Sequence, residues 1–182
     1  EVLHGQGRYH HPILWERGMD WQGEGKVHQG HSTDVITDRT LAWLHMARES
    51  DRPFFCMCHF KATHAPFYSD ERFRHAYRDV DFPEPIDLLN PDSPKDKVFE
   101  GWPLEIHMQR CLDNPGHNPP PVLDVKGMEP LEARQATYQK MVRDYMRTVA
   151  GIDENLGRLL DWLDFFFNDT TTTEIYTTAP GK

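Results

Sequence analysis

The sequence lacks a long hydrophobic run. None of its 182 residues fall in a stretch of about 18 consecutive apolar residues, and a membrane-spanning helix needs roughly 20. We therefore predict no membrane span. The chain begins at Glu1 and shows no signal peptide, and we predict that it starts within a longer protein. The missing signal peptide then carries no information about the compartment.

Cysteine is scarce, and basic residues are outnumbered. Three cysteines cannot form a disulfide framework, and neither Cys-x-x-Cys nor His-Glu-x-x-His spacing occurs, so the sequence predicts no zinc site. Lys and Arg total 20 against 29 Asp and Glu, a net charge of −9 that argues against nucleic acid as the partner. A local basic pocket can still bind an anionic substrate.

The most informative stretch that is present is PFFCMCHFKATHAPF, at residues 53–67. Its apolar part, 54–60, is typical of a short buried strand. A polar turn follows at once and brings Lys61, Thr63 and His64 together. A cation and an imidazole at the end of a buried strand are a common way to build an anion site in an α/β enzyme.

Two segments have the pattern of helices. The first runs from Ser32 to about Glu49, where hydroxyl and carboxylate side chains at residues 32–34 can cap the first turn. The second, residues 131–163, carries apolar residues at steps of three and four. A helix, a turn and a strand in this order indicate an α/β layered fold. Residues 1–31 predict loops with a short hairpin, and residues 69–77 a short helix.

Five segments, in this order, resemble the type I sulfatases of the alkaline-phosphatase superfamily. They are GQGRYHHP at 5–12, STDVITD at 32–38, KATHAP at 61–66, DVDFP at 79–83 and YMRTVAGIDENLGRLLDWLD at 145–164. The resemblance implies an α/β fold with a mixed sheet sandwiched by helices, incomplete here, with residues 1–164 as the central part of the catalytic domain. It also implies hydrolysis of sulfate esters by a formylglycine nucleophile with calcium. A sulfated small molecule or sulfated polysaccharide would be the substrate, and the protein would be exported, periplasmic or lysosomal.

The same resemblance implies roles for the polar turn. The family histidine that matches His64 donates a hydrogen bond to a sulfate oxygen, and Lys61 would add positive charge nearby. Thr63 stands where many relatives have proline, and we assign it to substrate binding on its position alone.

The family's nucleophile motif, Cys-x-Pro-x-Arg or Ser-x-Pro-x-Arg, does not occur in the sequence. The family's calcium ligands would lie before Glu1 and after Asp164. We therefore predict that this piece holds neither nucleophile nor metal. The GKVH sequence at 25–28 resembles a catalytic motif of the family, but it lies too close to residue 32, and we predict a hairpin or loop there.

The last segment, FFFNDTTTTEIYTTAPGK at 165–182, breaks the composition of the chain. It resembles translated sequencing-adapter DNA, and we predict a non-native tail. Two other functions stay open at this point. One is a phosphoesterase or phosphonate hydrolase of the same superfamily, and the other is a non-catalytic, carbohydrate-binding relative.

Overall fold

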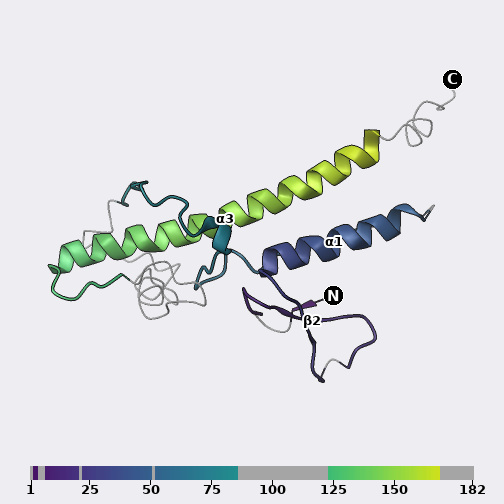
Figure 1. The fold of residues 1–182 in the computed structure, drawn as a ribbon, viewed down its shortest axis with the longest axis horizontal. Helices are drawn as coiled ribbons and strands as arrows, with labels where there is room; N and C mark the ends of the chain where they lie inside the picture. Colours follow the sequence, from purple (N-terminus) through teal and green to yellow (C-terminus); the bar gives the residue numbers. More distant parts are fainter. Residues whose placement is uncertain (1, 4–6, 21, 51, 86–122, 169–182) are drawn as a thin grey trace, which may run out of the picture.

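The computed structural model describes residues 2–3, 7–20, 22–50, 52–85 and 123–168. Two helices and a small sheet make up its regular structure (Figure 1). Helix α3, Pro130–Asn168, runs along the longest axis, and helix α1, Ser32–Arg48, lies beside its C-terminal half. Both helices predicted from the sequence are confirmed.

Helix α1 begins at a histidine cap. His31 has extended backbone angles, and its ring Nδ1 accepts a hydrogen bond from the N–H of Thr33 at 3.3 Å. The predicted cap by the side chains of residues 32–34 is therefore wrong, although Asp34 does lie in the first turn, where a negative charge suits the helix dipole. An imidazole nitrogen serves here because the cap requires only an acceptor near the first amides.

The two helices share one small hydrophobic core. Its buried residues are Leu44 of α1 with Leu159 and Trp162 of α3, and several half-buried side chains pack around them: Leu41, Cys58, Leu163 and Phe166. The apolar steps of three and four in this helix include Leu156 and Leu160 and predict them on the same face, yet they are 45% and 63% exposed. They lie about 100° around the helix from their neighbours Asn155 and Leu159, which face α1.

Two charged residues of α3 are buried. The helical pattern predicts Asp144 and Arg147 on the side away from the core, but they are only 4% and 7% exposed. Asp144 is buried between two cations, at 2.5 Å from Lys140 Nζ and 2.8 Å from an Arg147 nitrogen. Arg147 also donates to the carbonyl of Ala76 at 2.9 Å, which ties α3 to the segment after the 3₁₀ helix η1, Glu71–Phe73. Burial is tolerated because the charges compensate one another.

Helix α3 extends beyond the boundary predicted at residue 164. The ring of Phe166 stacks on that of Trp162 with centroids 5.3 Å apart, and the Arg48 guanidinium lies 5.2 Å from the centroid of the Phe165 ring. Residues 169–182 lie outside the described part of the chain, as do residues 86–122. The non-native tail stays a prediction.

A three-stranded antiparallel sheet lies near the start of α1 (Figure 1). Its strands are β1, Val2–Leu3, β2, Ile13–Trp15, and β3, Lys26–Val27, in that order across the sheet. Leu14 pairs with Leu3 on one side and with Lys26 on the other. The hairpin predicted within residues 1–31 is confirmed, and Lys26 belongs to it.

The strand predicted over 54–60 does not form in the structure. No described residue pairs with this segment, and Phe55 and Met57 are 80% and 66% exposed. A buried strand needs a neighbour for its N–H and C=O groups, so apolar composition alone does not make one. Cys58 is the residue of this segment that reaches the core around Leu44.

The predicted helix at 69–77 is reduced to the single 3₁₀ turn η1. Within the described ranges, no helix is both long and apolar enough to cross a membrane.

Candidate functional site: the histidine turn and its groove

The turn at residues 61–66 is closed by its own backbone. The N–H of His64 donates to the carbonyl of Lys61 at 3.0 Å, and the N–H of Phe67 donates to the carbonyl of His64 at 3.4 Å. The turn contains two cis peptide bonds, Ala62–Thr63 and Ala65–Pro66. The two hydrogen bonds close the turn, so Lys61 and His64 lie at two ends of one tight loop.

The imidazole of His64 is exposed but held in one orientation. Its Nδ1 lies 2.6 Å from the carbonyl oxygen of Ala65. A carbonyl oxygen only accepts, so Nδ1 is the donor and carries a proton. The other ring nitrogen, Nε2, can then donate to a ligand only when the ring is doubly protonated. That cationic form suits an anionic group or a leaving oxygen.

Lys61 and Tyr9 form the inner side of the turn. The Lys61 ammonium lies 4.9 Å from the centroid of the Tyr9 ring, a favourable cation–π contact. Burial lowers the pKa of Lys61 below its ordinary value. The Tyr9 hydroxyl donates to the carbonyl of His64 at 2.5 Å. No role was predicted for Tyr9, although it lies in the GQGRYHHP segment that resembles the family.

A groove of about 1310 Å³ opens beside the turn. Lys61 and His64 line one part of it, while apolar side chains line much of the rest, including Leu14, Trp43 and Phe55. Lys61 and His64 thus meet at one groove, as the sequence predicted. Thr63 is half-buried and is not among the described residues that line the groove, so its substrate-binding role stays a prediction.

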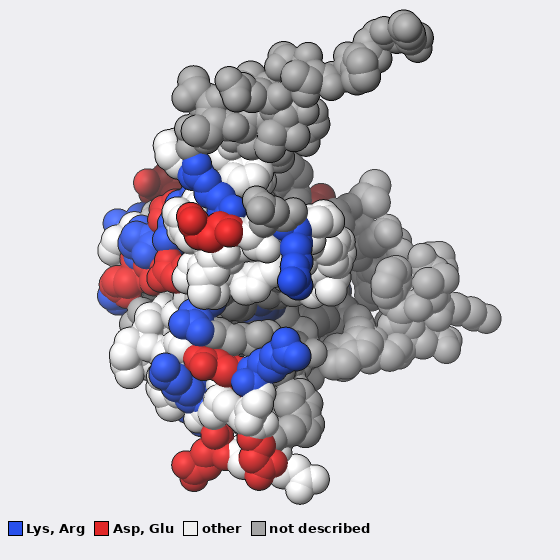
Figure 2. Space-filling model, turned by 90° about the vertical axis from the view of Figure 1, so that its right-hand side faces the viewer, with Lys and Arg blue, Asp and Glu red and all other residues white. Residues whose placement is uncertain are grey.

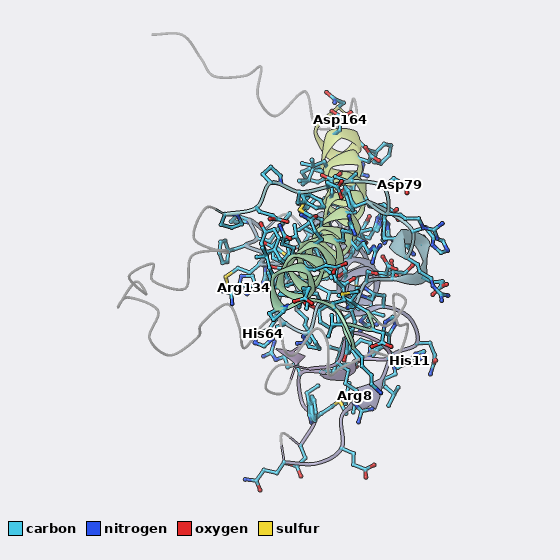
Figure 3. The ribbon with its side chains drawn as sticks, turned by 90° about the vertical axis from the view of Figure 1, so that its left-hand side faces the viewer. Arg8, His11, His64, Asp79, Arg134 and Asp164 are labelled. Carbon is cyan, nitrogen blue, oxygen red and sulfur yellow. The ribbon has the colours of Figure 1, made fainter. Side chains whose placement is uncertain are left out.

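The histidine turn lies near the small sheet (Figure 3). In Figure 3, His64 lies toward the end that holds the small sheet, together with Arg8 and His11, whereas Asp164 lies at the far end of α3. On the face shown in Figure 2, Lys and Arg side chains are interspersed with Asp and Glu. That face offers no broad surface of one charge (Figure 2).

The described residues do not fit a metal ion. Among the ranges that the structure describes, no three His, Cys, Asp or Glu side chains come together as ligands. Calcium requires a cluster of six to eight oxygen ligands. The residues described here therefore do not form the family's calcium site.

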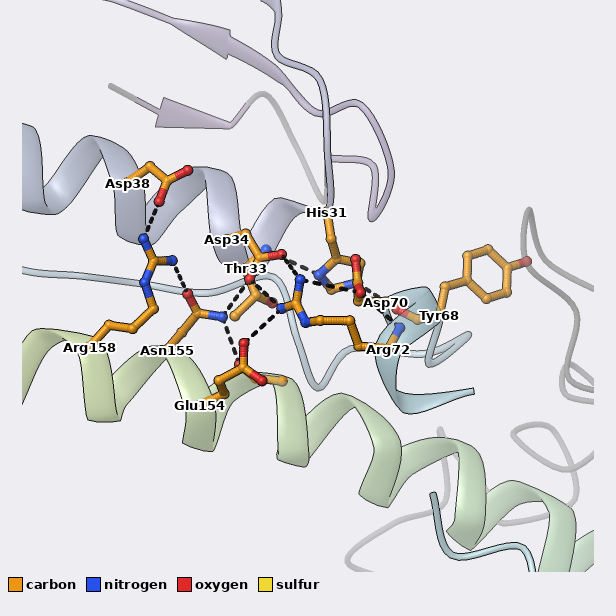
Figure 4. Close-up of polar contacts among 11 residues, drawn as sticks. His31, Thr33, Asp34, Asp38, Tyr68, Asp70, Arg72, Glu154, Asn155 and Arg158 are labelled. Atoms are coloured by element: carbon orange, nitrogen blue, oxygen red, sulfur yellow. Dashed lines mark hydrogen bonds and ion pairs between the residues drawn. The ribbon is translucent and has the colours of Figure 1, made fainter. Parts of the chain in front are cut away.

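A polar junction joins α1, η1 and α3 (Figure 4). Arg72 forms a bidentate pair with Asp34 at 3.0 and 2.9 Å, and the fully buried Asn155 donates to the same carboxylate at 2.7 Å. Burial alone would raise the pKa of Asp34, but the hydrogen bonds from Arg72 and Asn155 hold it below its ordinary value. Arg158 extends the junction by bridging Asn155 and Asp38.

His31 connects this junction to the histidine turn. Its Nδ1 caps α1, and its Nε2 donates to the carbonyl of Tyr68 at 2.9 Å, so the ring is neutral with the proton on Nε2. Burial lowers its pKa below 6.5, and outweighs the opposing effects of the Tyr68 carbonyl, Asp70 and Asp34.

This lowered pKa predicts a pH dependence of stability. As pH falls through about 6.5, the unfolded chain takes up a proton at His31 that the folded chain does not. The free energy of unfolding should therefore decrease with falling pH until the folded-state pKa is reached. His31→Asn keeps a capping acceptor but cannot titrate, so its stability should fall less than that of the wild type between pH 7.5 and 5.5. Urea unfolding at both pH values measures the difference, and equal slopes for the two proteins would contradict the prediction.

Comparisons with known proteins found relatives of this chain. A family model described as Sulfatase matches residues 6–177. N-acetylglucosamine-6-O-sulfatase from Bacteroides thetaiotaomicron is 27% identical over an alignment 216 residues long, which covers 98% of this chain and 37% of that protein. A solved protein in complex with its substrate, D-glucosamine-2-N,6-O-disulfate, has a TM-score of 0.59 and 25% sequence identity, covering 87% of this chain and 38% of that chain.

The chain thus spans less than two fifths of the length of either relative. The predicted sulfatase-like α/β fold class is confirmed, in the incomplete form that the sequence indicated. The match extends along nearly the whole chain and includes the KATHAP turn that carries Lys61 and His64. This chain belongs to the sulfatase family.

Proposed function

We propose that this chain supplies the sulfate-contacting turn of a sulfuric ester hydrolase. The observation that carries the proposal is that Lys61 and His64 line the same groove. The Tyr9 hydroxyl holds the turn that carries them, and the chain belongs to the sulfatase family. Positive groups held in place before the substrate arrives stabilise charge that develops during the reaction. This convergence favours an anionic ester as the substrate.

The names of the relatives narrow the substrate class. One relative is an N-acetylglucosamine-6-O-sulfatase, and the other was solved with a glucosamine disulfate. We therefore propose an amino sugar that carries a sulfate ester on its O6 as the substrate. A sulfated polysaccharide containing that sugar is the extended form of the same class.

The chemistry assigned to the turn is limited to binding and proton donation. Hydrolysis breaks the ester link between sulfur and the sugar oxygen, and yields sulfate and an alcohol whose oxygen gains a proton. Doubly protonated His64 can hydrogen-bond a sulfate oxygen or donate that proton from Nε2, while Lys61 adds positive charge. The formylglycine motif does not occur in this sequence, so no nucleophilic step is assigned to its residues.

A chimera tests this function directly. In the Bacteroides enzyme, the stretch that matches residues 1–164 of this chain is replaced by those residues, and sulfate released from N-acetylglucosamine 6-sulfate is measured by ion chromatography. We expect turnover by the chimera and none of 4-nitrophenyl sulfate by the isolated chain. A folded chimera that releases no sulfate, together with an isolated chain whose His64 ring signals do not shift with inorganic sulfate, would refute the proposal.

A further inference from the structure

We propose that Tyr9 is a positioning residue, which holds the His64 turn in the geometry that meets a sulfate group. The inference rests on the proposed function, because it assigns to Tyr9 an effect exerted through His64. Tyr9 lies 55 residues before His64 in the sequence, in the loop that leads into β2. It therefore links two segments whose relative position only the tertiary structure sets.

The Tyr9 ring is fixed on several sides. The residue is 3% exposed, and its ring centroid lies 5.6 Å from that of His31 and 5.8 Å from that of Tyr68. His31 is itself bonded to the Tyr68 carbonyl and to the start of α1. A ring held in this way can act as a rigid support for whatever its hydroxyl contacts.

The hydroxyl acts on the backbone of His64, and the Ala65 carbonyl acts on its ring. Tyr9 Oη donates to the His64 carbonyl at 2.5 Å, while Nδ1 of His64 lies 2.6 Å from the Ala65 oxygen. Burial raises the pKa of Tyr9 far above its ordinary value, so the phenol is protonated and a donor at neutral pH. One bond therefore fixes the imidazole, and the other, which comes from outside the turn, fixes the backbone that carries it.

The Tyr9 ring also contacts the Lys61 ammonium. The Lys61 ammonium lies 4.9 Å from the Tyr9 ring centroid, and Lys61 lines the same groove as His64. One tyrosine thus contacts both residues that we assign to sulfate, through its hydroxyl and through its face. Tyr9→Phe removes the first contact and keeps the second, which separates the two effects.

The test compares Tyr9→Phe with a matched control in the full chain. Tyr138 also donates its phenol to a backbone carbonyl, that of Pro83 at 3.0 Å, but it lies in α3 and does not line the groove. NMR would follow the His64 carbonyl carbon and the Thr63 amide, with inorganic sulfate as the probe and sodium chloride at equal ionic strength as the reference. Thermal melts of both variants report any general loss of stability.

We expect Tyr9→Phe to shift the His64 carbonyl signal and to weaken sulfate binding about threefold to tenfold, while Tyr138→Phe changes neither. The effect on sulfate should disappear in a His64→Ala background, because it acts through that side chain. If the carbonyl signal shifts but sulfate affinity is unchanged, Tyr9 is only a structural contact and the inference is wrong. If the wild type shows no sulfate-dependent shift, the proposed sulfate site itself fails, and the inference fails with it.

Discussion

Replacing His64 by alanine in the chimeric sulfatase is expected to lower kcat by about 100- to 1000-fold, the effect of removing one donor from a preorganised anion site. The structure gives the reason. The Ala65 carbonyl fixes one ring nitrogen, and Tyr9 fixes the backbone, so the remaining nitrogen is presented at a defined place. Water that fills the space left by alanine has no such orientation before the reaction begins.

The measurement is sulfate release under saturating substrate, with His75→Ala as the matched control. His75 is also exposed, but it lies outside the groove beside the turn. Its replacement should change kcat by no more than about twofold. Equal losses in the two variants would show that histidine removal damages the chimera in general, and a fully active His64→Ala variant would exclude His64 from the reaction.

Asp144→Ala is expected to lower the free energy of unfolding by about 3–5 kcal/mol, because it leaves buried positive charge without its partner. The carboxylate lies between Lys140 and Arg147, whose side chains are 13% and 8% exposed. Arg147 also donates to Ala76, so its displacement would loosen the contact between α3 and the segment after η1. Urea unfolding followed by circular dichroism measures the change.

Two further variants make that experiment decisive. Asp153 is an exposed carboxylate in the same helix, and Asp153→Ala should change the free energy of unfolding by less than about 0.5 kcal/mol. Replacing all three members, as Lys140→Met, Asp144→Leu and Arg147→Met, should recover most of the stability lost in Asp144→Ala, since apolar residues of similar volume need no counter-charge. A small effect of Asp144→Ala alone would mean that the cations reach water in the folded protein.

Residues 54–60 were predicted to form a buried strand and do not form one. Their composition is that of a buried strand, yet in the structure Phe55 and Met57 are exposed and no described segment pairs with them. A strand is defined by hydrogen bonds to another strand, and composition carries no information about whether that partner is present. The turn that follows did form, because its closing bonds join residues three apart in the chain.

The sequence by itself determined the features that depend on neighbours in the chain: the two helices, the hairpin and the histidine turn. Its motifs also indicated membership of the sulfatase family. Helical periodicity and turn chemistry act over three or four residues, so the pattern that produces them can be seen directly. Only the tertiary structure decided that His31 caps α1 while bonding Tyr68, that Tyr9 supports His64, and that Asp144 is buried with Arg147. Tyr9 and His64 are 55 residues apart, and Asp34 and Asn155 are 121 apart. Contacts over such separations depend on how the elements pack, and burial then sets which charges must be paired and which groups keep their protons.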